Sequence, residues 1–313
     1  MENKIHIKPT TKSSFQGERV NTSLKLFRFG EIENEKPGVL TEDGKYIDVS
    51  VFGEDYNGKF FATNGVERLA EWLVENINSC PLIPADSRIA ACVGLPSKLI
   101  GIGLNYTKHA NESGMAIPKE PIVFMKATTC ICGPYDNIII PPGSIKTDWE
   151  AELAIVIGRK ASYVSEEDAK DYIAGYTIIV DYSEREYQSE RGGSWDKGKS
   201  ADTFGPLGPY LQTTSPDFDP TNLKIWLNVN GELLQNSTTA DMIFNVYTIV
   251  SYVSQFMTLL PGDVIATGTP AGVGFGFKPP RYLKVGDVIE TGIERLGTQK
   301  QTTVQFTSMI NKL

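Results

Sequence analysis

Histidine is scarce in this 313-residue chain, which contains only His6 and His109. The scarcity excludes zinc and iron sites built from several histidines, and it leaves oxygen atoms as the only well-supplied metal ligands. Cysteine is also rare, and no pair has the C-x-x-C spacing of zinc and redox sites. The four cysteines are Cys80, Cys92, Cys130 and Cys132. We therefore expect reduced, buried thiols rather than disulfides or zinc ligands.

Long apolar runs are absent too. No stretch of 18 or more apolar residues occurs, so we expect no transmembrane helix. Residues 1–22 lack the continuous apolar core of a secretory signal, and we expect a polar extension there in a cytoplasmic protein. The net charge of −8 and the lack of a basic cluster argue against nucleic acid or membrane partners. A small anionic substrate remains compatible, because arginine and lysine inside a cleft outweigh a diffuse negative surface.

Short strand-like runs dominate what is present, and helical segments are few. The sequence therefore predicts an α+β, mainly β protein with a rolled, barrel-like mixed sheet rather than a doubly wound one. A segment with two prolines near residues 81–95 is typical of a linker. We accordingly expect a small N-terminal α+β domain over 23–90 and a larger domain over 95–313.

Three segments show helical patterns. One starts at Ser165, a residue type favoured at helix N-termini, with Asp168 three residues later. Another has Val246, Ile249, Val250 and Val253 on one face. The longest places Val66, Leu69, Ala70, Leu73, Val74 and Ile77 at helical spacing.

The segment TDWEAELAIVIG, residues 147–158, combines an apolar strand with acidic residues at its start. Glu150 and Glu152 point the same way on a strand, where two like charges repel each other and resist burial. A hard divalent cation would reconcile them, and Asp181, at the end of the strand YTIIVD, offers a third carboxylate. The alternative is that both glutamates lie on a solvated face of an edge strand. Asp148 is a weaker candidate ligand, because turn residues are common at strand entrances.

A second candidate cluster is GLNYTKHANESG, in which His109 and Glu112 are three residues apart on a short helix. A carboxylate beside an imidazole orients it and raises its basicity, as a general base requires. The alternative is an ordinary surface contact on a helix.

The third cluster lies in residues 181–206. A helical stretch places Arg185 and Gln188 on one side, and the glycine-rich RGGSWDKGKS follows it. Its length and glycines suit a lid that closes on a ligand, and Lys199 between two small residues could polarise a carbonyl or hold a carboxylate. The alternative is a flexible, solvated loop.

Another glycine-rich segment, ATGTPAGVGFGFKPP, follows a strand but fails as a dinucleotide fingerprint. Pro270 interrupts it, and Lys278-Pro279-Pro280 stands where the phosphate-binding helix should begin. The sequence also has no G-x-x-x-x-G-K-[ST] and no G-x-S-x-G. Nucleotide binding and serine-triad hydrolysis are both disfavoured.

Taken in order, these segments resemble the fumarylacetoacetate hydrolase family. The matching motifs cover nearly all of residues 98–300 and include GLNYTKHANESG, PIVFMK, DWEAELAIVIG, AGYTIIVDYSERE, WDKGKSADTFGPLGP and SYVSQFMTLLPGDVIATGTPAGVG. The resemblance implies a mixed, rolled β-sheet core, usually in a homodimer, with one Mg²⁺ (or Mn²⁺ or Ca²⁺) per site. By resemblance, the site residues are Glu150, Glu152 and Asp181 for the metal, His109, Glu112 and Lys199 for catalysis, and Arg185, Gln188 and Thr269 for substrate binding.

The resemblance further implies hydrolysis of a C–C bond in a 2,4-diketo acid, giving pyruvate and a carboxylic acid through a His-Glu activated water and a metal-stabilised enolate. Similarity to bacterial sugar-acid hydrolases suggests 2,4-diketo-3-deoxy-L-fuconate or L-rhamnonate as substrate. The alternatives on the same site are oxaloacetate decarboxylation or tautomerisation, hydration of 2-keto-4-pentenoate, and ureidoglycolate cleavage. An alternative of another class is a non-catalytic metabolite-binding protein.

Overall fold

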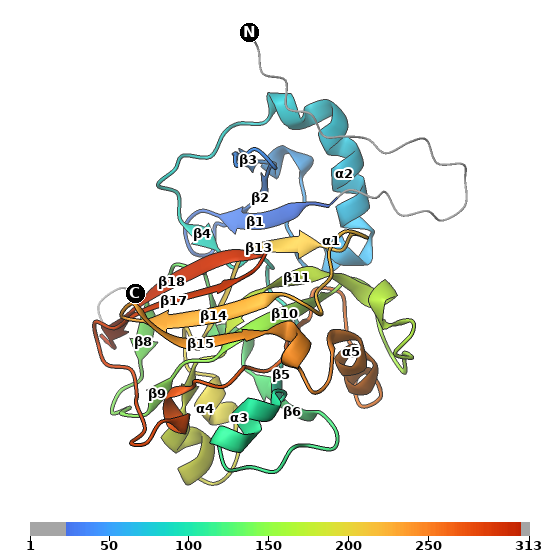
Figure 1. Cartoon of the computed structure of the whole chain (residues 1–313). Coiled ribbons are helices and arrows are strands. Elements are labelled where there is room, and N and C mark those ends of the chain that lie inside the picture. The colour runs from blue at the N-terminus through green and yellow to red at the C-terminus, as the bar shows by residue number, and fades with distance from the viewer. Residues whose placement is uncertain (1–22, 308–313) are drawn as a thin grey trace.

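The structure, a computed structural model, describes residues 23–307, so the expected polar extension lies outside the described residues. The larger of two main sheets has the strand order β3-β2-β1-β13-β11-β10-β16-β5-β6, with β4 paired to β1 and β7 to β13 (Figure 1). Its strands are β1 Lys25–Phe29, β2 Lys36–Leu40, β3 Tyr46–Asp48, β4 Ile89–Ala90, β5 Leu99–Gly103, β6 Ile122–Lys126, β7 Ile131–Cys132, β10 Ala151–Ile157, β11 Ile173–Val180, β13 Gly205–Thr213 and β16 Val264–Ala266.

The second sheet has the order β15-β14-β17-β18-β8, and β9 and β12 form a separate pair. These strands are β8 Ile138–Ile140, β9 Thr147–Asp148, β12 Ser183–Glu184, β14 Lys224–Val229, β15 Glu232–Thr238, β17 Val288–Ile293 and β18 Gly297–Gln305. Each main sheet contains parallel and antiparallel pairs. The predicted mainly β, mixed-sheet class is confirmed, although neither main sheet closes into a barrel within residues 23–307.

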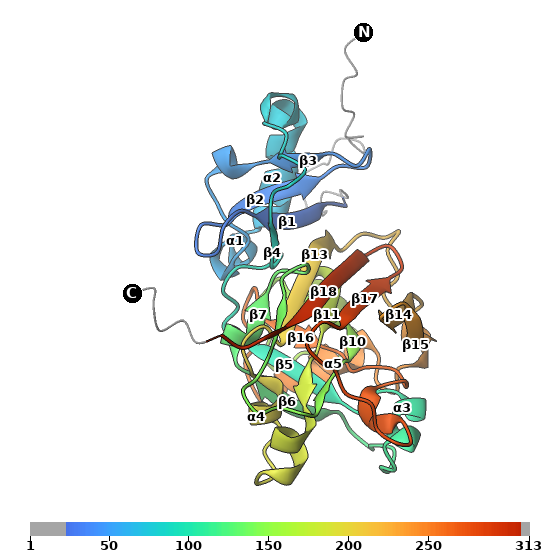
Figure 2. The ribbon, with the colours of Figure 1, turned by 90° about the vertical axis from the view of Figure 1, so that its left-hand side faces the viewer.

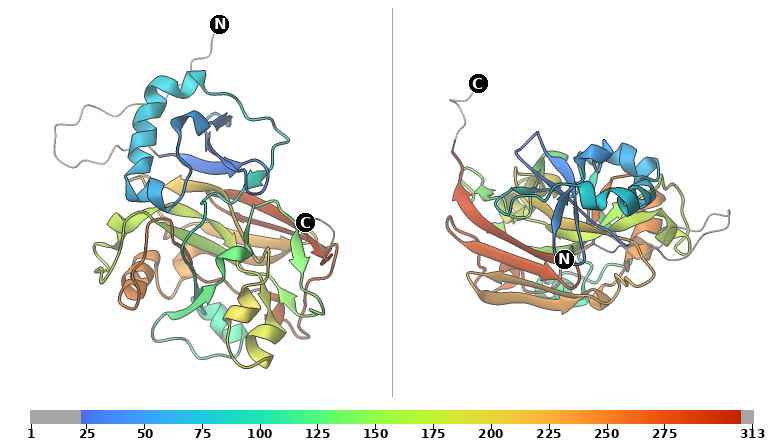
Figure 3. Two further views of the ribbon diagram at one scale, coloured as in Figure 1. Left: turned by 180° about the vertical axis from the view of Figure 1, so that it is seen from behind. Right: turned by 90° about the horizontal axis from the view of Figure 1, so that it is seen from above.

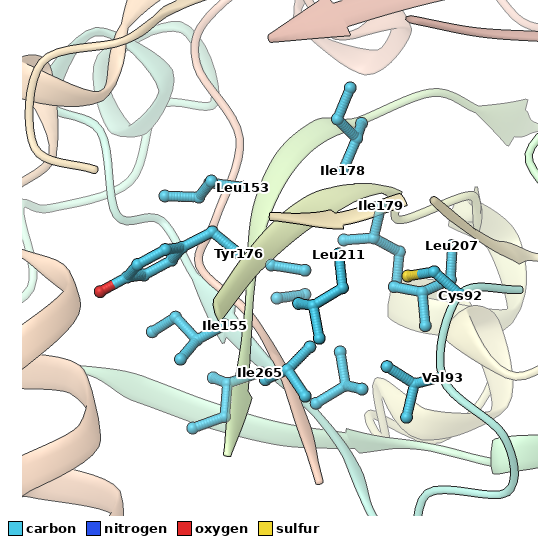
Figure 4. Close-up of a cluster of buried hydrophobic side chains, with 14 of the residues drawn as sticks. Cys92, Val93, Leu153, Ile155, Tyr176, Ile178, Ile179, Leu207, Leu211 and Ile265 are labelled. Atoms are coloured by element: carbon cyan, nitrogen blue, oxygen red, sulfur yellow. The ribbon is translucent and has the colours of Figure 1, made fainter. Parts of the chain in front are cut away.

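The core lies where β10, β11 and β13 of the larger sheet pack against strands of the second sheet. Figure 4 shows a cluster of buried hydrophobic side chains in this core, most of them from neighbouring strands. Leu153 and Ile155 of β10, Ile178 of β11 and Leu211 of β13 are fully buried there. This packing fixes β10 and β11 against each other, and these are the strands that carry the three candidate metal ligands.

The expected N-terminal domain, residues 23–90, forms a unit at one end of the molecule, in which helix α2 (Gly65–Asn76) lies beside β1, β2 and β3 (Figures 2 and 3). The unit is not a separate sheet, because β1 pairs with β13 through Lys25↔Gln212 and Leu26↔Leu211. Its status as an independent domain stays a prediction.

The second half of the linker expected near residues 81–95 packs into the main core. Cys92 and Val93 are buried in the main core, and the amide of Cys92 donates to the carbonyl of Leu207. The apolar run Ile89-Ala90-Ala91-Cys92-Val93 explains this, since apolar residues of a connecting segment gain by packing against a sheet.

The helices are α1 Gly58–Ala62, α2 Gly65–Asn76, α3 Thr107–Glu112, α4 Asp196–Lys199 and α5 Val246–Ser254. The predicted buried face of α5 is confirmed, and the Asn245 side chain caps this helix by accepting from the amides of Tyr247 and Thr248. On α2 the prediction fails at Val74, which is 55% exposed. No helix between residues 23 and 307 is both long enough and apolar enough to cross a membrane.

The helix expected from Ser165 is reduced to a turn and a short 3₁₀ segment, Ala169–Tyr172. The Ser165 hydroxyl does accept from the Asp168 amide at 3.2 Å, as a capping residue would. Because β11 begins at Ile173, only this one turn fits between the cap and the strand.

Candidate metal centre and active site

The three predicted carboxylates converge because of how two strands pair. Glu150 immediately precedes β10, Glu152 is its second residue, and Asp181 follows β11. The strands are antiparallel with Ala151 opposite Val180, so the entrance of one lies beside the exit of the other. One carboxylate oxygen from each residue lies within 4.8 Å of the other two, and all three side chains are buried. The alternative of a solvated edge-strand face is therefore wrong.

Cationic side chains contact two of these carboxylates. Lys199 Nζ lies 2.5 Å from Glu150 Oε2 and 2.7 Å from Asp181 Oδ2. Burial alone would raise the pKa of Glu150, but the charges of Lys199 and Arg185 outweigh burial and hold that pKa well below its usual range. Likewise, burial disfavours the charged form of Lys199, but Asp181 and Glu150 raise its pKa, so the ammonium stays protonated.

Glu152 differs from the other two, because no cationic side chain in the described part of the chain contacts its carboxylate. Its Oε2 accepts only from the Gly268 amide, at 2.7 Å. Burial raises the pKa of Glu152, and the nearby charges of Asp181 and Glu150 raise it further. A buried carboxylate without a counter-cation, beside two further carboxylates, is the donor set that a hard dication takes. The residues present therefore fit a metal ion.

His109 and Glu112 form the predicted pair on α3. Nδ1 of His109 lies 2.8 Å from Glu112 Oε1, and His109 is 6% exposed and lines the cavity that contains Glu150 and Glu152. The Glu112 carboxylate is itself fixed, since it accepts from the Gly272 amide at 2.9 Å. A carboxylate held in this way orients the ring and leaves Nε2 as the free nitrogen.

Residues 268–277, which we call the glycine loop, explain the glycine-rich segment that failed as a nucleotide fingerprint. Its amides donate to carboxylates of the site: Gly268 to Glu152, Gly272 to Glu112, and Gly274 to Asp148. Glycine is required at 272, where φ is +106° and a Cβ atom would lie 1.9 Å from the Leu234 carbonyl oxygen.

Asp148, the weaker candidate ligand in the sequence, is fully buried and binds several segments of the chain. Its carboxylate accepts from the amides of Gly274 and Phe275 and from Nε of Arg185 at 2.8 Å. Arg185 also donates to Glu150 at 2.7 Å and to Gln188 at 3.0 Å. Asp148 therefore links β9, the segment with Arg185 and the glycine loop.

Lys126, at the end of β6, is a residue of the site that was not predicted from the sequence. Its Nζ lies 2.6 Å from Asp181 Oδ1, and it also donates to the carbonyl of Lys199. The only signal was its position in the motif PIVFMK, where a lysine ends an apolar strand. Thr269, in contrast, lies where the resemblance implied, lining the cavity, although its hydroxyl already donates to the Ala151 carbonyl and accepts from Gln235.

The expected lid segment, residues 181–206, is partly helical. It contains a π-helical turn, Glu186–Glu190, and the helix α4. Lys199 ends α4 and is 2% exposed, so it is a buried group and not part of a solvated loop.

Seven of the nine predicted site residues line one cavity, and the other two, Glu112 and Asp181, contact residues that line it. Its volume is about 380 Å³, and it is lined by His109, Glu150, Glu152, Arg185, Gln188, Lys199 and Thr269 among others. A larger cavity of about 630 Å³ lies between α2 and the ends of β11 and β13, but none of the predicted site residues lines it.

The chain is similar to proteins of one family. Residues 98–304 match the family model described as fumarylacetoacetate (FAA) hydrolase C-terminal. A Burkholderia multivorans protein named "Putative hydrolase" is 52% identical over 281 residues, covering 90% of this chain and 99% of that protein.

The chain belongs to the fumarylacetoacetate hydrolase family.

Solved structures of similar proteins support this membership. The fumarylacetoacetate hydrolase from Exiguobacterium antarcticum has a TM-score of 0.79 and 36% identity, covering 90% of this chain and 100% of that one. The maleylpyruvate hydrolase from Sphingobium sp. SYK-6, solved with manganese(II) ion and pyruvate, has a TM-score of 0.75 and 29% identity over the same shares. The family predicted from the sequence motifs is confirmed.

Proposed function

We propose that this family member is a divalent-metal-dependent hydrolase that cleaves a C–C bond of a 2,4-diketo acid, giving pyruvate and a carboxylic acid. The observation that carries the proposal is the convergence of Glu150, Glu152 and Asp181 at a cavity that Glu150, Glu152 and His109 line. A similar protein of known structure is a maleylpyruvate hydrolase with manganese(II) and pyruvate, which supports both the metal and the product.

Glu150, Glu152 and Asp181 would hold the metal ion, because all three offer buried carboxylate oxygens. When bound, the ion supplies Lewis-acid polarisation of the substrate's oxygen atoms and compensates negative charge. We expect Mg²⁺ as the resident ion, with Mn²⁺ or Ca²⁺ as substitutes, since an all-oxygen ligand set accepts each of them.

The side chains divide the remaining work. His109, oriented through Nδ1 by Glu112, takes a proton from water at Nε2 while that water attacks the carbonyl carbon at position 4. The Lys199 ammonium stabilises the negative charge that develops on the position-4 oxygen. When the bond between carbons 3 and 4 breaks, its electron pair goes to carbon 3, and His109 returns the proton there. Water is added across the bond, and the products are an acid and pyruvate.

The identity of the acyl group is the finer part of the proposal. The sequence-based expectation is 2,4-diketo-3-deoxy-L-fuconate or L-rhamnonate. Oxaloacetate, 2-keto-4-pentenoate and ureidoglycolate are the competing substrates, because each could bind a metal at the same carboxylates. A panel of all these compounds separates the reactions by product.

The test measures pyruvate release from acylpyruvates with Mg²⁺ or Mn²⁺ and with excess chelator, together with calorimetric Mn²⁺ binding. We expect turnover only with metal, and Glu150→Gln should weaken Mn²⁺ binding by at least about 100-fold. The matched control is Glu75→Gln, an exposed glutamate on α2, which should change neither. Full turnover in chelator, or wild-type Mn²⁺ affinity in the Glu150 variant, would overturn the proposal.

A further inference from the structure

The cavity of the candidate active site has two chemically different sides. The acidic and basic groups described above form one side. The other side consists of apolar side chains from β5 and the segment after it, the loop after α3, β6, the segment before α4 and the glycine loop. These residues are Ile102, Leu104, Met115, Phe124, Trp195 and Phe275, which we call the apolar wall.

The apolar wall begins directly beside the charged groups. The ring of Phe124 lies 5.2 Å from Lys199 Nζ and packs edge-on against Trp195 at 5.5 Å. On another side, the ring of Phe275 lies 5.9 Å from the guanidinium of Arg185. A substrate carbonyl that reaches Lys199 must therefore place its next carbons against aromatic rings.

Glycine at position 103 leaves space for one side chain of the apolar wall. A Cβ atom at Gly103 would come within 2.5 Å of the Trp195 ring, so glycine at this position lets the indole pack against β5. Two members of the wall remain open to solvent, since Met115 is 47% and Phe275 is 44% exposed. Apolar side chains left exposed at the mouth of a polar site are a feature that a bound apolar group would cover.

Polar partners for a hydroxylated substrate are few among the lining residues. Thr269 already uses its hydroxyl as donor and acceptor, and Gln188 Oε1 accepts from Arg185. Ser113, which is half-buried, and Ser189, which is exposed, also line the cavity. A hydroxyl group placed against the apolar wall would lose its water without gaining an aligned partner, which costs binding energy.

We propose that the acyl group of the substrate is an apolar alkyl or aryl chain that binds along the apolar wall. This inference rests on the proposed C–C hydrolysis and narrows its substrate class. It runs against the sugar-acid substrates expected from the sequence, because these carry a hydroxyl on the carbon next to the position-4 carbonyl.

The first experiment compares substrates that differ only in the acyl group, with kcat/KM for pyruvate release as the readout. The pair 2,4-dioxohexanoate and 5-hydroxy-2,4-dioxohexanoate isolates the hydroxyl, and we expect the hydroxylated compound to be about 100-fold poorer. Acetylpyruvate, 2,4-dioxooctanoate and benzoylpyruvate isolate size, and we expect at least a tenfold gain from acetylpyruvate to the larger two.

The outcomes separate the two proposals. If the hydroxylated compound equals or exceeds its alkyl partner, or if acetylpyruvate is the best substrate, the apolar acyl group is wrong and the hydrolase function stands. If no acylpyruvate releases pyruvate with any divalent metal, the proposed function fails, and the inference that depends on it fails as well.

Variants supply an independent check on which residues select the substrate. Met115→Ser and Phe275→Ser should each lower the ratio of kcat/KM for 2,4-dioxooctanoate over acetylpyruvate by roughly tenfold, because apolar contact with the longer chain is lost. Val74→Ser, an exposed valine on α2, is the matched control and should leave this ratio unchanged. An unchanged ratio in both wall variants would contradict the proposal.

Discussion

At the scale of single residues, the buried carboxylates of the candidate site differ in how many cationic side chains contact them. Glu150 and Asp181 share Lys199, Asp181 also binds Lys126, and Glu152 has no cationic side chain against it among residues 23–307. Because burial raises the pKa of Glu152, this residue gains most from a bound cation.

A single substitution should separate the role of the His109–Glu112 pair in turnover from the role of the candidate metal ligands in metal binding. His109→Ala removes the proton acceptor but leaves all three carboxylates, so we expect kcat to fall by about 10²–10⁴-fold while Mn²⁺ affinity is retained. Steady-state kinetics and calorimetry measure the two effects.

Lys108→Ala, an exposed neighbour on the same helix, is the control for that experiment and should behave as wild type. Substantial hydrolysis by the His109 variant would show that another group activates the water.

At this scale the sequence predicted what depends on local spacing. Glu150 and Glu152 were found because strand residues two apart share a face, and His109 and Glu112 because helix residues three apart are neighbours. Lys126 could not be found in this way, because its meaning depends on Asp181, 55 residues away in the chain. Only the pairing of strands brings these two residues together.

At the scale of elements, the glycine loop holds the site together through its backbone. Its amides donate to Glu152 and Asp148, which lie in the segment 147–158, and to Glu112 on α3, far from that segment in the chain. The carboxylates are therefore positioned by one loop as well as by their own strands and helix. A substitution that moves the backbone of that loop should therefore displace both the candidate metal ligands and the His109–Glu112 pair.

Asp148→Asn tests this link. The amide cannot accept all the hydrogen bonds of the carboxylate, and it leaves Arg185 with one acidic partner fewer. We expect kcat/KM to fall about 10–100-fold and the free energy of unfolding to fall on the order of 3 kcal/mol.

Kinetics and urea unfolding measure the two quantities, and the exposed turn residue Asp86 supplies the control as Asp86→Asn, which should change neither. Restoration by Asp148→Glu of part of the activity, but not of the stability, would indicate that the charge positions Arg185. Wild-type kinetics in the Asn variant would contradict the positioning role.

Strands with alternating or continuous apolar residues were predictable, but β13 was not. It contains Pro206 and Pro209, which cannot donate to a sheet, and such residues argue against a central strand. The structure accommodates Pro209 because the ladder between β11 and β13 shifts register between Tyr176 and Ile178, opposite this residue. Pro206 lies beyond the last pair of that ladder, Ile179↔Leu207. Because a bulge depends on the pairing with the partner strand, the sequence of β13 by itself carries no signal of it.

At the scale of the whole molecule, the resemblance implies a homodimer, and this stays a prediction. Sedimentation equilibrium should give twice the 34.5 kDa of one chain. The mass should not change when metal is removed by chelation, because the candidate ligands are buried inside one subunit. A single-chain mass at micromolar concentration would contradict the expected assembly.

The junction between β1 and β13 bears on how the chain can be divided. Leu24 and Thr213 exchange hydrogen bonds there, and Cys92 and Val93 fill space beneath β13. An excised fragment that begins after residue 94 would present an unprotected strand border and an open apolar hollow, both of which promote self-association. Protein engineers who want a minimal version of this enzyme should therefore keep the first strands, even though no side chain from them reaches the chemistry.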